Sequence, residues 1–344
     1  MLGIMFLVYY LLFSLIYLSK IDPSRSFNLL LNSENNNNTV PMCKWHLTNI
    51  QSAENCKGFS ETIRQLSNIN AKKDYDFYNW FAGIIDGDGN FDIRKTSKNT
   101  YQLKSIRIKL HNRDVRILTY IQNYLHIGKI RADKHKPYSL YIVSNNKDKK
   151  FIIEALNGLI RIKVPGFMKA CSYFNIDYIE PNYDIKPFDP YFSGLIDTDG
   201  SIVFNYNSNR IECNLEFQYN DYTKKLNFEN TIPWYKPYIL LRKVKNNKSK
   251  KEFKTIAFKY QTVKGMMYLY EFFMKNRLYS DFKFYRVSKI KEFIIIRNYK
   301  NEPKNSIEFK IYSDFLLDWI QYRNPLWTKV LFISKIRLDK DIVQ

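Results

Sequence analysis

Short stretches of alternating apolar and polar residues are interleaved with stretches of helical periodicity in the C-terminal part of the chain. In residues 105–110 (SIRIKL), isoleucine and leucine alternate with serine, arginine and lysine, which predicts a strand with one buried and one cationic face. Residues 115–125 have the periodicity of a helix, residues 129–131 and 138–143 predict two further strands, and residues 151–160 predict another helix.

A second series of the same kind follows. Between residues 211 and 219 apolar and polar positions alternate again, which predicts a strand with a less basic outer face. Residues 241–254 (LRKVKNNKSKKEFK) predict a hairpin with a basic turn, and residues 263–274 predict a helix. The apolar positions of the strand are Ile211, Cys213, Leu215, Phe217 and Tyr219.

An internal repeat links the two series. FAGIIDGDG occupies residues 81–89 and FSGLIDTDG occupies residues 192–200, 111 residues later. Each motif opens one unit, so we expect an α+β fold of two pseudo-symmetric αββαββα repeats in a monomer with an approximate two-fold axis. The expected bounds are 77–180 for the first repeat and 188–344 for the second, with a boundary near residues 178–187.

The first 76 residues differ in character. Residues 1–19 carry no charge and are long enough for one membrane-spanning helix, with a secretory signal peptide as the weaker interpretation. An equal alternative is that residues 1–76 derive from an upstream exon fused in frame. Residues 32–39 (NSENNNNT) have the composition of a polar linker.

The charge of the chain indicates its partner. The 344 residues carry 54 basic and 33 acidic side chains, a net charge of +21, and residues 77–344 hold 47 of the basic and 27 of the acidic ones. Nucleic acid is the expected counter-charge, because a membrane surface would gather basic residues next to the apolar leader. The four cysteines contain no C-x-x-C pair, which argues against a zinc ribbon and a disulfide framework.

Each repeated motif has the residues of a helix that ends at a glycine-containing turn. Small residues within the motifs would let two such helices pack closely. These residues are Ala82, Gly83, Ser193 and Gly194. Acidic residues stand at both helix ends, where the helix dipole disfavours negative charge. If the helices pack side by side, Asp88 and Asp199 face each other, an arrangement that a shared hard divalent ion such as Mg²⁺ would stabilise.

Both motifs fit the pattern F-[AS]-G-[IL]-I-D-x-D-G, with D-G-D-G in the first and D-T-D-G in the second. They resemble the two motifs of the two-repeat LAGLIDADG homing endonuclease and intron maturase family. The resemblance covers residues 77–318. It implies a saddle of antiparallel sheets around a central interface of two motif helices. It also implies phosphoryl transfer, in which a bound metal activates water and neutralises the scissile phosphate.

Site residues are implied by the same resemblance. Asp88 and Asp199 match the metal-binding catalytic acids, and the carbonyl groups of Gly87 and Thr198 match additional metal ligands. Thr198 departs from the small residue usual at that place. Asp86 and Asp197 match the mainly structural acid of each motif, and Lys163 and Lys283 match basic residues that contact the solvent network at the scissile phosphate.

The resemblance further implies that the polar faces of both sheets bind DNA, some residues reading bases and others contacting phosphate. In the first repeat the implied residues are Asp92, Arg94, Thr96, Lys98, Ser105, Arg107, Lys109, Lys129 and Arg131. In the second repeat they are Asn205, Asn207, Arg210, Asn214, Gln218, Arg242, Lys243 and Lys245.

These observations predict a monomeric, Mg²⁺-dependent endonuclease that cuts a double-stranded DNA site and promotes homing of its group I intron. The alternative is an RNA maturase that assists splicing of its own group I intron, with or without cleavage activity; a third is a copy with neither activity. The richness in Asn, Lys, Ile and Tyr is typical of an AT-rich genome. Together with the apolar leader, this composition favours a mitochondrial location over a plastid. Association with a membrane through residues 1–19 is left open.

Overall fold

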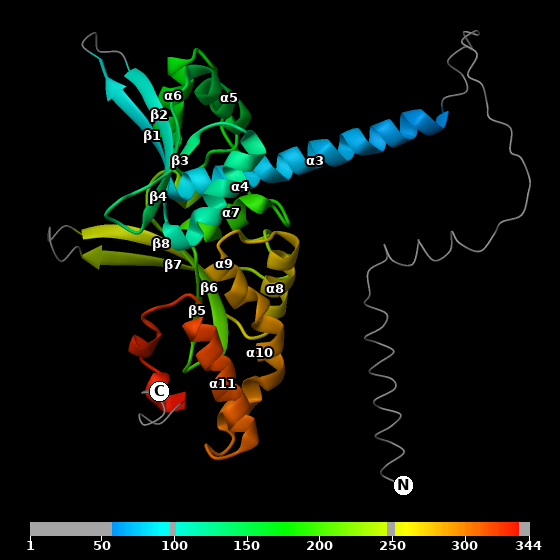
Figure 1. Ribbon diagram of the computed structural model, residues 1–344, viewed down its shortest axis with the longest axis vertical. Coiled ribbons are helices and arrows are strands. Elements are labelled where there is room, and N and C mark those ends of the chain that lie inside the picture. The colour runs from blue at the N-terminus through cyan, green and yellow to red at the C-terminus, as the bar shows by residue number, and fades with distance from the viewer. Residues whose placement is uncertain (1–56, 97–100, 246–251, 337–344) are drawn as a thin grey trace, which may run out of the picture. The chain divides into compact units, whose positions relative to one another are not determined.

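Two four-stranded antiparallel sheets organise the chain, one in each repeat, as the computed structural model shows (Figure 1). The structure describes residues 57–96, 101–245 and 252–336. The apolar segment 1–19, the linker 32–39 and Lys98 lie outside these residues. None of the helices within the described ranges has the length and apolarity to cross a membrane.

The first sheet has the order β1-β2-β4-β3 and the second the order β5-β6-β8-β7. Their strands are β1 (Gly89–Lys95), β2 (Tyr101–His111), β3 (Lys129–Ala132), β4 (Tyr138–Val143), β5 (Ser201–Asn205), β6 (Arg210–Gln218), β7 (Tyr238–Lys245) and β8 (Glu252–Tyr260). Between β1 and β2 the register shifts after Asp92, and this irregularity keeps both Leu103 and Ile106 buried.

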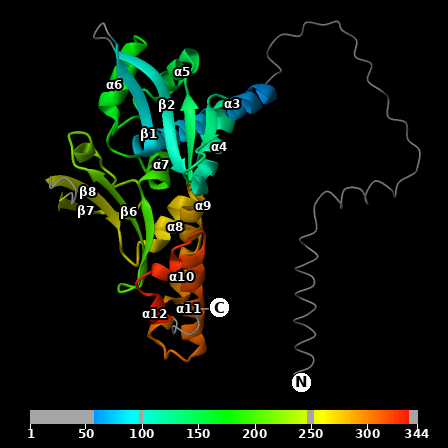
Figure 2. The ribbon, with the colours of Figure 1, turned by 60° about the vertical axis from the view of Figure 1, so that its left-hand side comes forward.

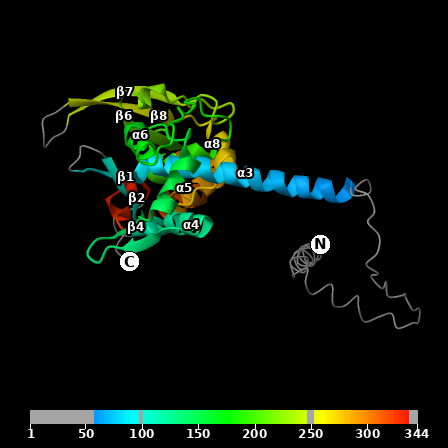
Figure 3. The same ribbon diagram turned by 90° about the horizontal axis from the view of Figure 1, so that it is seen from above.

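The α-helices are α3 (Lys57–Asp88), α4 (Val115–Leu125), α5 (Asn146–Leu156), α6 (Val164–Tyr173), α7 (Pro190–Thr198), α8 (Met266–Lys275), α9 (Asp281–Ser288), α10 (Ile290–Ile296), α11 (Ile307–Gln321) and α12 (Ile333–Ile336). Short 3-10 helices cover 112–114, 223–225, 297–301 and 327–329. Figure 2 shows α8 and α10 on one side of the second sheet, and in Figure 3 α3 lies between that sheet and α4.

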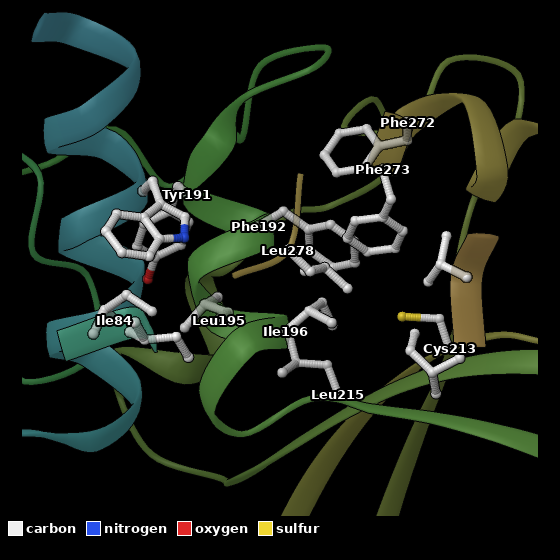
Figure 4. Close-up of a cluster of buried hydrophobic side chains, with 14 of the residues drawn as sticks. Ile84, Tyr191, Phe192, Leu195, Ile196, Cys213, Leu215, Phe272, Phe273 and Leu278 are labelled. Atoms are coloured by element: carbon white, nitrogen blue, oxygen red, sulfur yellow. The ribbon is translucent and has the colours of Figure 1, made fainter. Parts of the chain in front are cut away.

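Apolar side chains from both repeats form one continuous core around α7. Phe192 on α7 packs against Phe272 and Phe273 of α8, with ring centroids 5.5 and 6.0 Å away (Figure 4). Cys213 is buried in the same core, as its place on the apolar face of the strand predicts.

The predicted α+β class and the two antiparallel sheets are confirmed. The second repeat differs in having only the 3-10 helix 223–225 between its two hairpins, since prolines at 233 and 237 disfavour an α-helix there. It also continues beyond α9, which follows α8 as α6 follows α5, into α10–α12.

Several predicted boundaries are corrected. The helix expected at 151–160 is α5, shifted towards the N-terminus, because the Asn145 side chain caps its start and Gly158 adopts a φ of 83° beyond its end. The helix expected at 263–274 begins at Met266. Tyr219 lies outside β6 and is exposed. The first motif forms the end of the 32-residue helix α3 rather than a short helix.

Two glycines set the distance between α3 and α7. A Cβ atom on Gly83 would lie 2.3 Å from the carbonyl oxygen of Tyr191, and one on Gly194 would lie 2.1 Å from the carbonyl oxygen of Trp80. These neighbours are backbone atoms, which cannot rotate away. The predicted close contact is therefore confirmed for Gly83 and Gly194. Ala82 is fully buried, whereas the Ser193 hydroxyl donates to the carbonyl of Asn276, 3.0 Å away.

We predict that Gly83→Ala lowers the free energy of unfolding by about 1–3 kcal/mol, the usual cost of overpacking a well-packed core. The matched control is Gly166→Ala in α6, where an added Cβ would meet Phe91 at 3.5 Å, an ordinary contact distance. Urea denaturation followed by circular dichroism measures both. Equal stabilities of the two variants would contradict the proposed role of Gly83.

Candidate functional site

The ends of α3 and α7 lie against each other where each motif ends. A Cβ atom on Gly87 would lie 1.9 Å from the Thr198 hydroxyl oxygen, so the last turns of the two helices are in contact. The Thr198 hydroxyl donates within its own helix, to the carbonyl oxygens of Gly194 and Leu195 at 3.0 and 3.1 Å. The larger side chain of Thr198 thus fits against glycine on the partner helix. Asp88 and Asp199 follow immediately.

Asp88 and Asp199 are close enough to interact electrostatically. Asp88 is half-buried and Asp199 is more exposed, so solvent reaches the pair from one side. Burial raises the pKa of Asp88, and the charge of Asp199 raises it further. Burial also raises the pKa of Asp199, while Lys163 and Lys283 oppose that increase. The two carboxylates therefore lie at the same end of the helix pair, and their joint role in metal binding stays a prediction.

Two lysines, the half-buried Lys163 and the buried Lys283, cap the ends of the motif helices. The Lys163 ammonium donates to the carbonyl oxygens of Gly87 and Gly89. The Lys283 ammonium donates to those of Ile196, Asp197 and Thr198, at 2.7, 2.9 and 2.8 Å. Carbonyl groups at a helix C-terminus lack partners within the helix, and a cation there also opposes the helix dipole. Each lysine thus stabilises a helix end that acidic residues alone would destabilise.

Burial lowers the pKa of both lysines, and the surrounding aspartates partly offset this effect. Lys163 and Lys283 therefore lie close enough to Asp88 and Asp199 to interact with them electrostatically. Their ammonium groups contact the carbonyls of Gly87 and Thr198, which the resemblance assigns to metal binding. The catalytic role that the resemblance implies for Lys163 and Lys283 stays a prediction. The same holds for the metal-binding role of the carbonyl groups of Gly87 and Thr198.

The other two motif acids hold the repeats together. Asp86 accepts hydrogen bonds from the backbone N–H groups of Arg161 and Lys163, at 2.7 and 2.9 Å, and from the hydroxyl of Tyr191 at 2.8 Å. Tyr191 belongs to the opposite repeat, so this carboxylate links the two halves.

Asp197 repeats this arrangement with different partners. It accepts from the backbone N–H groups of Tyr279 and Ser280, at 3.0 and 2.8 Å, and from the indole N–H of Trp80 at 3.0 Å. Burial raises its pKa to about 6, while these donors favour the ionised form. Each carboxylate therefore joins the end of its own repeat to an aromatic residue of the other.

Trp80 and Tyr191 link the two repeats, and the sequence analysis did not assign this role to them. Both stand directly before the phenylalanine that opens a motif. Their equal distance from the start of the motif could have identified them in the sequence, because residues at matching positions of a two-fold repeat make matching contacts across the axis.

The donor set at the acid pair suits a hard divalent cation. It consists of two carboxylates and nearby backbone carbonyls, which are oxygen ligands of the kind that Mg²⁺ and Ca²⁺ prefer. A shared cation would relieve the repulsion that raises the pKa of Asp88. Within the described residues no group of three or more His, Cys, Asp and Glu side chains could form a metal site.

The ladder of the first sheet gathers the predicted DNA-binding residues on one face. Arg107 is paired with Ile142, which is paired with Lys129, and directly paired residues of a ladder share a face. Lys109 and Arg131 are joined through Leu140 in the same way.

An acid orients two of these arginines. Asp92 accepts a 2.7 Å hydrogen bond from the Arg107 guanidinium and two longer bonds from Arg94. The Arg107 Nε also donates to the Ser105 hydroxyl at 2.7 Å. The hydrogen bond from Arg94 lowers the pKa of Asp92, with a further contribution from the charge of Arg107. Thr96 follows β1 in the chain.

The second sheet gathers a more mixed set. Asn205 and Arg210 are paired on its polar face, and both donate to Glu212, at 3.0 and 2.7 Å. Asn214, Gln218 and Arg242 lie on that face through their pairing with Lys259 and Thr255, and Asn207 lies in the turn after β5.

One assignment on this sheet is corrected. Lys243 is paired with Lys254, one position away from Arg242, so it lies on the opposite face of the sheet. Adjacent strand residues point to opposite faces, hence Arg242 and Lys243 do not share one reading surface. Lys245 ends β7, paired with Glu252.

Parts of this chain are similar to known proteins. Residues 81–174, the first repeat, match the family model for the LAGLIDADG endonuclease. The intron-encoded DNA endonuclease ai2a of Dictyostelium discoideum is 25% identical over 259 residues, which are 74% of this chain and 78% of that protein. The intron-encoded RNA maturase bI4 of Saccharomyces cerevisiae is 30% identical over 154 residues, which are 42% of this chain but only 23% of the maturase.

Among solved structures, the LAGLIDADG homing endonuclease I-GzeII in complex with its DNA target aligns with 72% of this chain and 99% of its own, at 15% identity and a TM-score of 0.46. The first repeat matches the family model of the LAGLIDADG endonuclease, and the second repeat carries a second copy of the motif, on a helix that meets the first at Gly83 and Gly194.

Proposed function

We propose that the protein is a Mg²⁺-dependent, site-specific double-strand DNA endonuclease, encoded within a group I intron and promoting homing of that intron. The observation that carries the proposal is the pair of matching acids, Asp88 and Asp199, at the joined ends of two pseudo-symmetric helices. One acid for each half of the molecule suits a substrate with two antiparallel strands. The likeness to the DNA endonuclease ai2a also supports it.

Each element of the chain has a part in this activity. The polar faces of the two sheets would lie in the major groove, where arginine, asparagine and glutamine side chains match the edges of bases. The acid pair would hold the divalent ion, which activates water and neutralises the scissile phosphate. Lys163 and Lys283 fix the helix ends and thereby the positions of Asp88 and Asp199.

A second function has a specific observation in its favour. The chain is similar to a protein named as an RNA maturase, at 30% identity over 154 residues. Assistance to splicing of its own group I intron is therefore the alternative proposal, alone or beside DNA cleavage. A monomer in the mitochondrion suits both functions, because one chain carries both motifs and the named relatives are intron-encoded.

We predict that Asp88→Asn and Asp199→Asn each convert double-strand cleavage into nicking or abolish it, because each removes a negative ligand from the shared site. The full-length chain is incubated with DNA spanning the intron insertion site, with Mg²⁺ and with EDTA. Staggered cutting by the parent chain that stops in EDTA is expected.

The control for the two acid variants is Glu154→Gln, an exposed carboxylate on α5. It should cut like the parent chain. Unchanged cutting by both Asp88→Asn and Asp199→Asn would refute the paired-acid site.

The Asp92 arrangement predicts a change in specificity. Asp92→Asn removes the charge that orients Arg107, so discrimination for guanine at the base pair beneath Arg107 should weaken by about 1–3 kcal/mol. Cleavage of a library of single-base target variants measures it, with Asp148→Asn on α5 as control. An unaltered preference at every position would count against orientation by Asp92.

If the protein is a maturase, a variant without the carboxylates of Asp88 and Asp199 should still assist splicing. Asp88→Asn/Asp199→Asn should leave the rate of intron splicing in vitro within about twofold of the parent chain, because RNA binding does not use the acid pair. No acceleration of splicing by the parent chain would eliminate this alternative.

A further inference from the structure

A cavity of about 360 Å³ opens at the other end of the motif helices from the acid pair. Residues of α3, α4 and α7 line it, together with the segment that follows α8. Trp80 lies eight residues before Asp88, or about 12 Å along a helix. The cavity is therefore separate from the proposed cleavage site, and its volume is in the range of small-molecule pockets.

Flat aromatic rings form much of the cavity wall. Tyr120 and Tyr279 stack with centroids 4.0 Å apart, and Phe77 and Tyr124 stack at 3.6 Å. Trp80 packs against Tyr279 at 4.8 Å. The three tyrosines are only half-buried, so the wall offers partly open aromatic surface to a planar ligand.

Cations surround these rings. Lys73, Lys275 and Arg277 line the cavity against a single carboxylate, Asp76. Aromatic contacts hold two of them in place: the Lys275 ammonium lies 3.8 Å from the Phe188 ring centroid, and the Arg277 guanidinium lies 4.1 Å from that of Phe284. An anionic group on a ligand would therefore meet positioned positive charge.

One further polar group of the wall is an unused donor. The side-chain amide nitrogen of Asn276 is buried and has no hydrogen-bond partner within the described chain. A buried donor without a partner costs free energy, which a ligand carbonyl or ring nitrogen could recover.

We propose that this cavity binds one unstacked nucleotide, its base against Tyr120, Tyr124 and Tyr279 and its phosphate beside Lys275 and Arg277. Stacking on aromatic side chains with nearby cations is how proteins hold bases of single-stranded nucleic acid. The nucleotide comes either from an unpaired position of an RNA or from the free nucleotide pool. Binding of a nucleotide from either source would not require the proposed DNA endonuclease activity.

The test measures binding to the full-length chain. One arm follows fluorescence anisotropy of a labelled single-stranded RNA and of the same RNA as a duplex, and the other titrates AMP and UMP by calorimetry. Lys275→Gln/Arg277→Gln and Tyr124→Leu should each weaken nucleotide or single-stranded RNA binding at least tenfold. Cleavage of duplex DNA by both variants should stay within twofold of the parent chain.

Two controls match these variants. Lys304→Gln/Lys310→Gln removes two exposed cations elsewhere, and Tyr268→Leu removes an exposed ring of α8; both should bind like the parent chain. Thermal unfolding verifies that Tyr124→Leu is folded. Binding of mononucleotides identifies the free pool as the source, and binding of single-stranded RNA alone identifies RNA. Failure of both probes to bind, or equal weakening by control and cavity variants, would overturn the proposal.

Discussion

The close approach of α3 and α7 at Gly83 and Gly194 is the contact on which the rest of the structure depends. Because no side chain separates the helices at these two glycines, their ends meet at Gly87 and Thr198 and bring Asp88 and Asp199 together. The same contact fixes how the two repeats face each other, since each motif leads directly into the first strand of a sheet. One backbone contact thus determines both the acid pair and the placement of the polar sheet faces.

Acidic residues at helix C-termini are unfavourable, and the structure offsets this in two ways. Lys163 and Lys283 supply positive charge to the unpaired carbonyl groups. Asp86 and Asp197 accept backbone N–H groups and one aromatic donor each from the opposite repeat. Within the described residues, the outer acids Asp88 and Asp199 accept no comparable hydrogen bonds, and a bound cation would relieve their repulsion.

The two repeats match more closely at the central helix pair than in their sheets. In the first sheet the orienting acid is Asp92 on β1, opposite Ser105, whereas in the second it is Glu212 on β6, opposite Val203. The acid has thus changed strands between the repeats while keeping its role beside arginine. Such differences suit a DNA site whose two halves have different sequences, and α10–α12 add a further departure from symmetry.

The sequence by itself determined the repeat, the α+β class, the positions of most strands along the chain and the candidate acids Asp88 and Asp199, because periodicity and a repeated motif are local signals that recur at a fixed distance. Only the tertiary structure decided the partners of Trp80 and Tyr191, the lysine contacts at Gly87 and Thr198, the opposite faces of Arg242 and Lys243, and the aromatic cavity. These features depend on strand register and on residues about a hundred positions apart, which hydrophobic pattern does not specify.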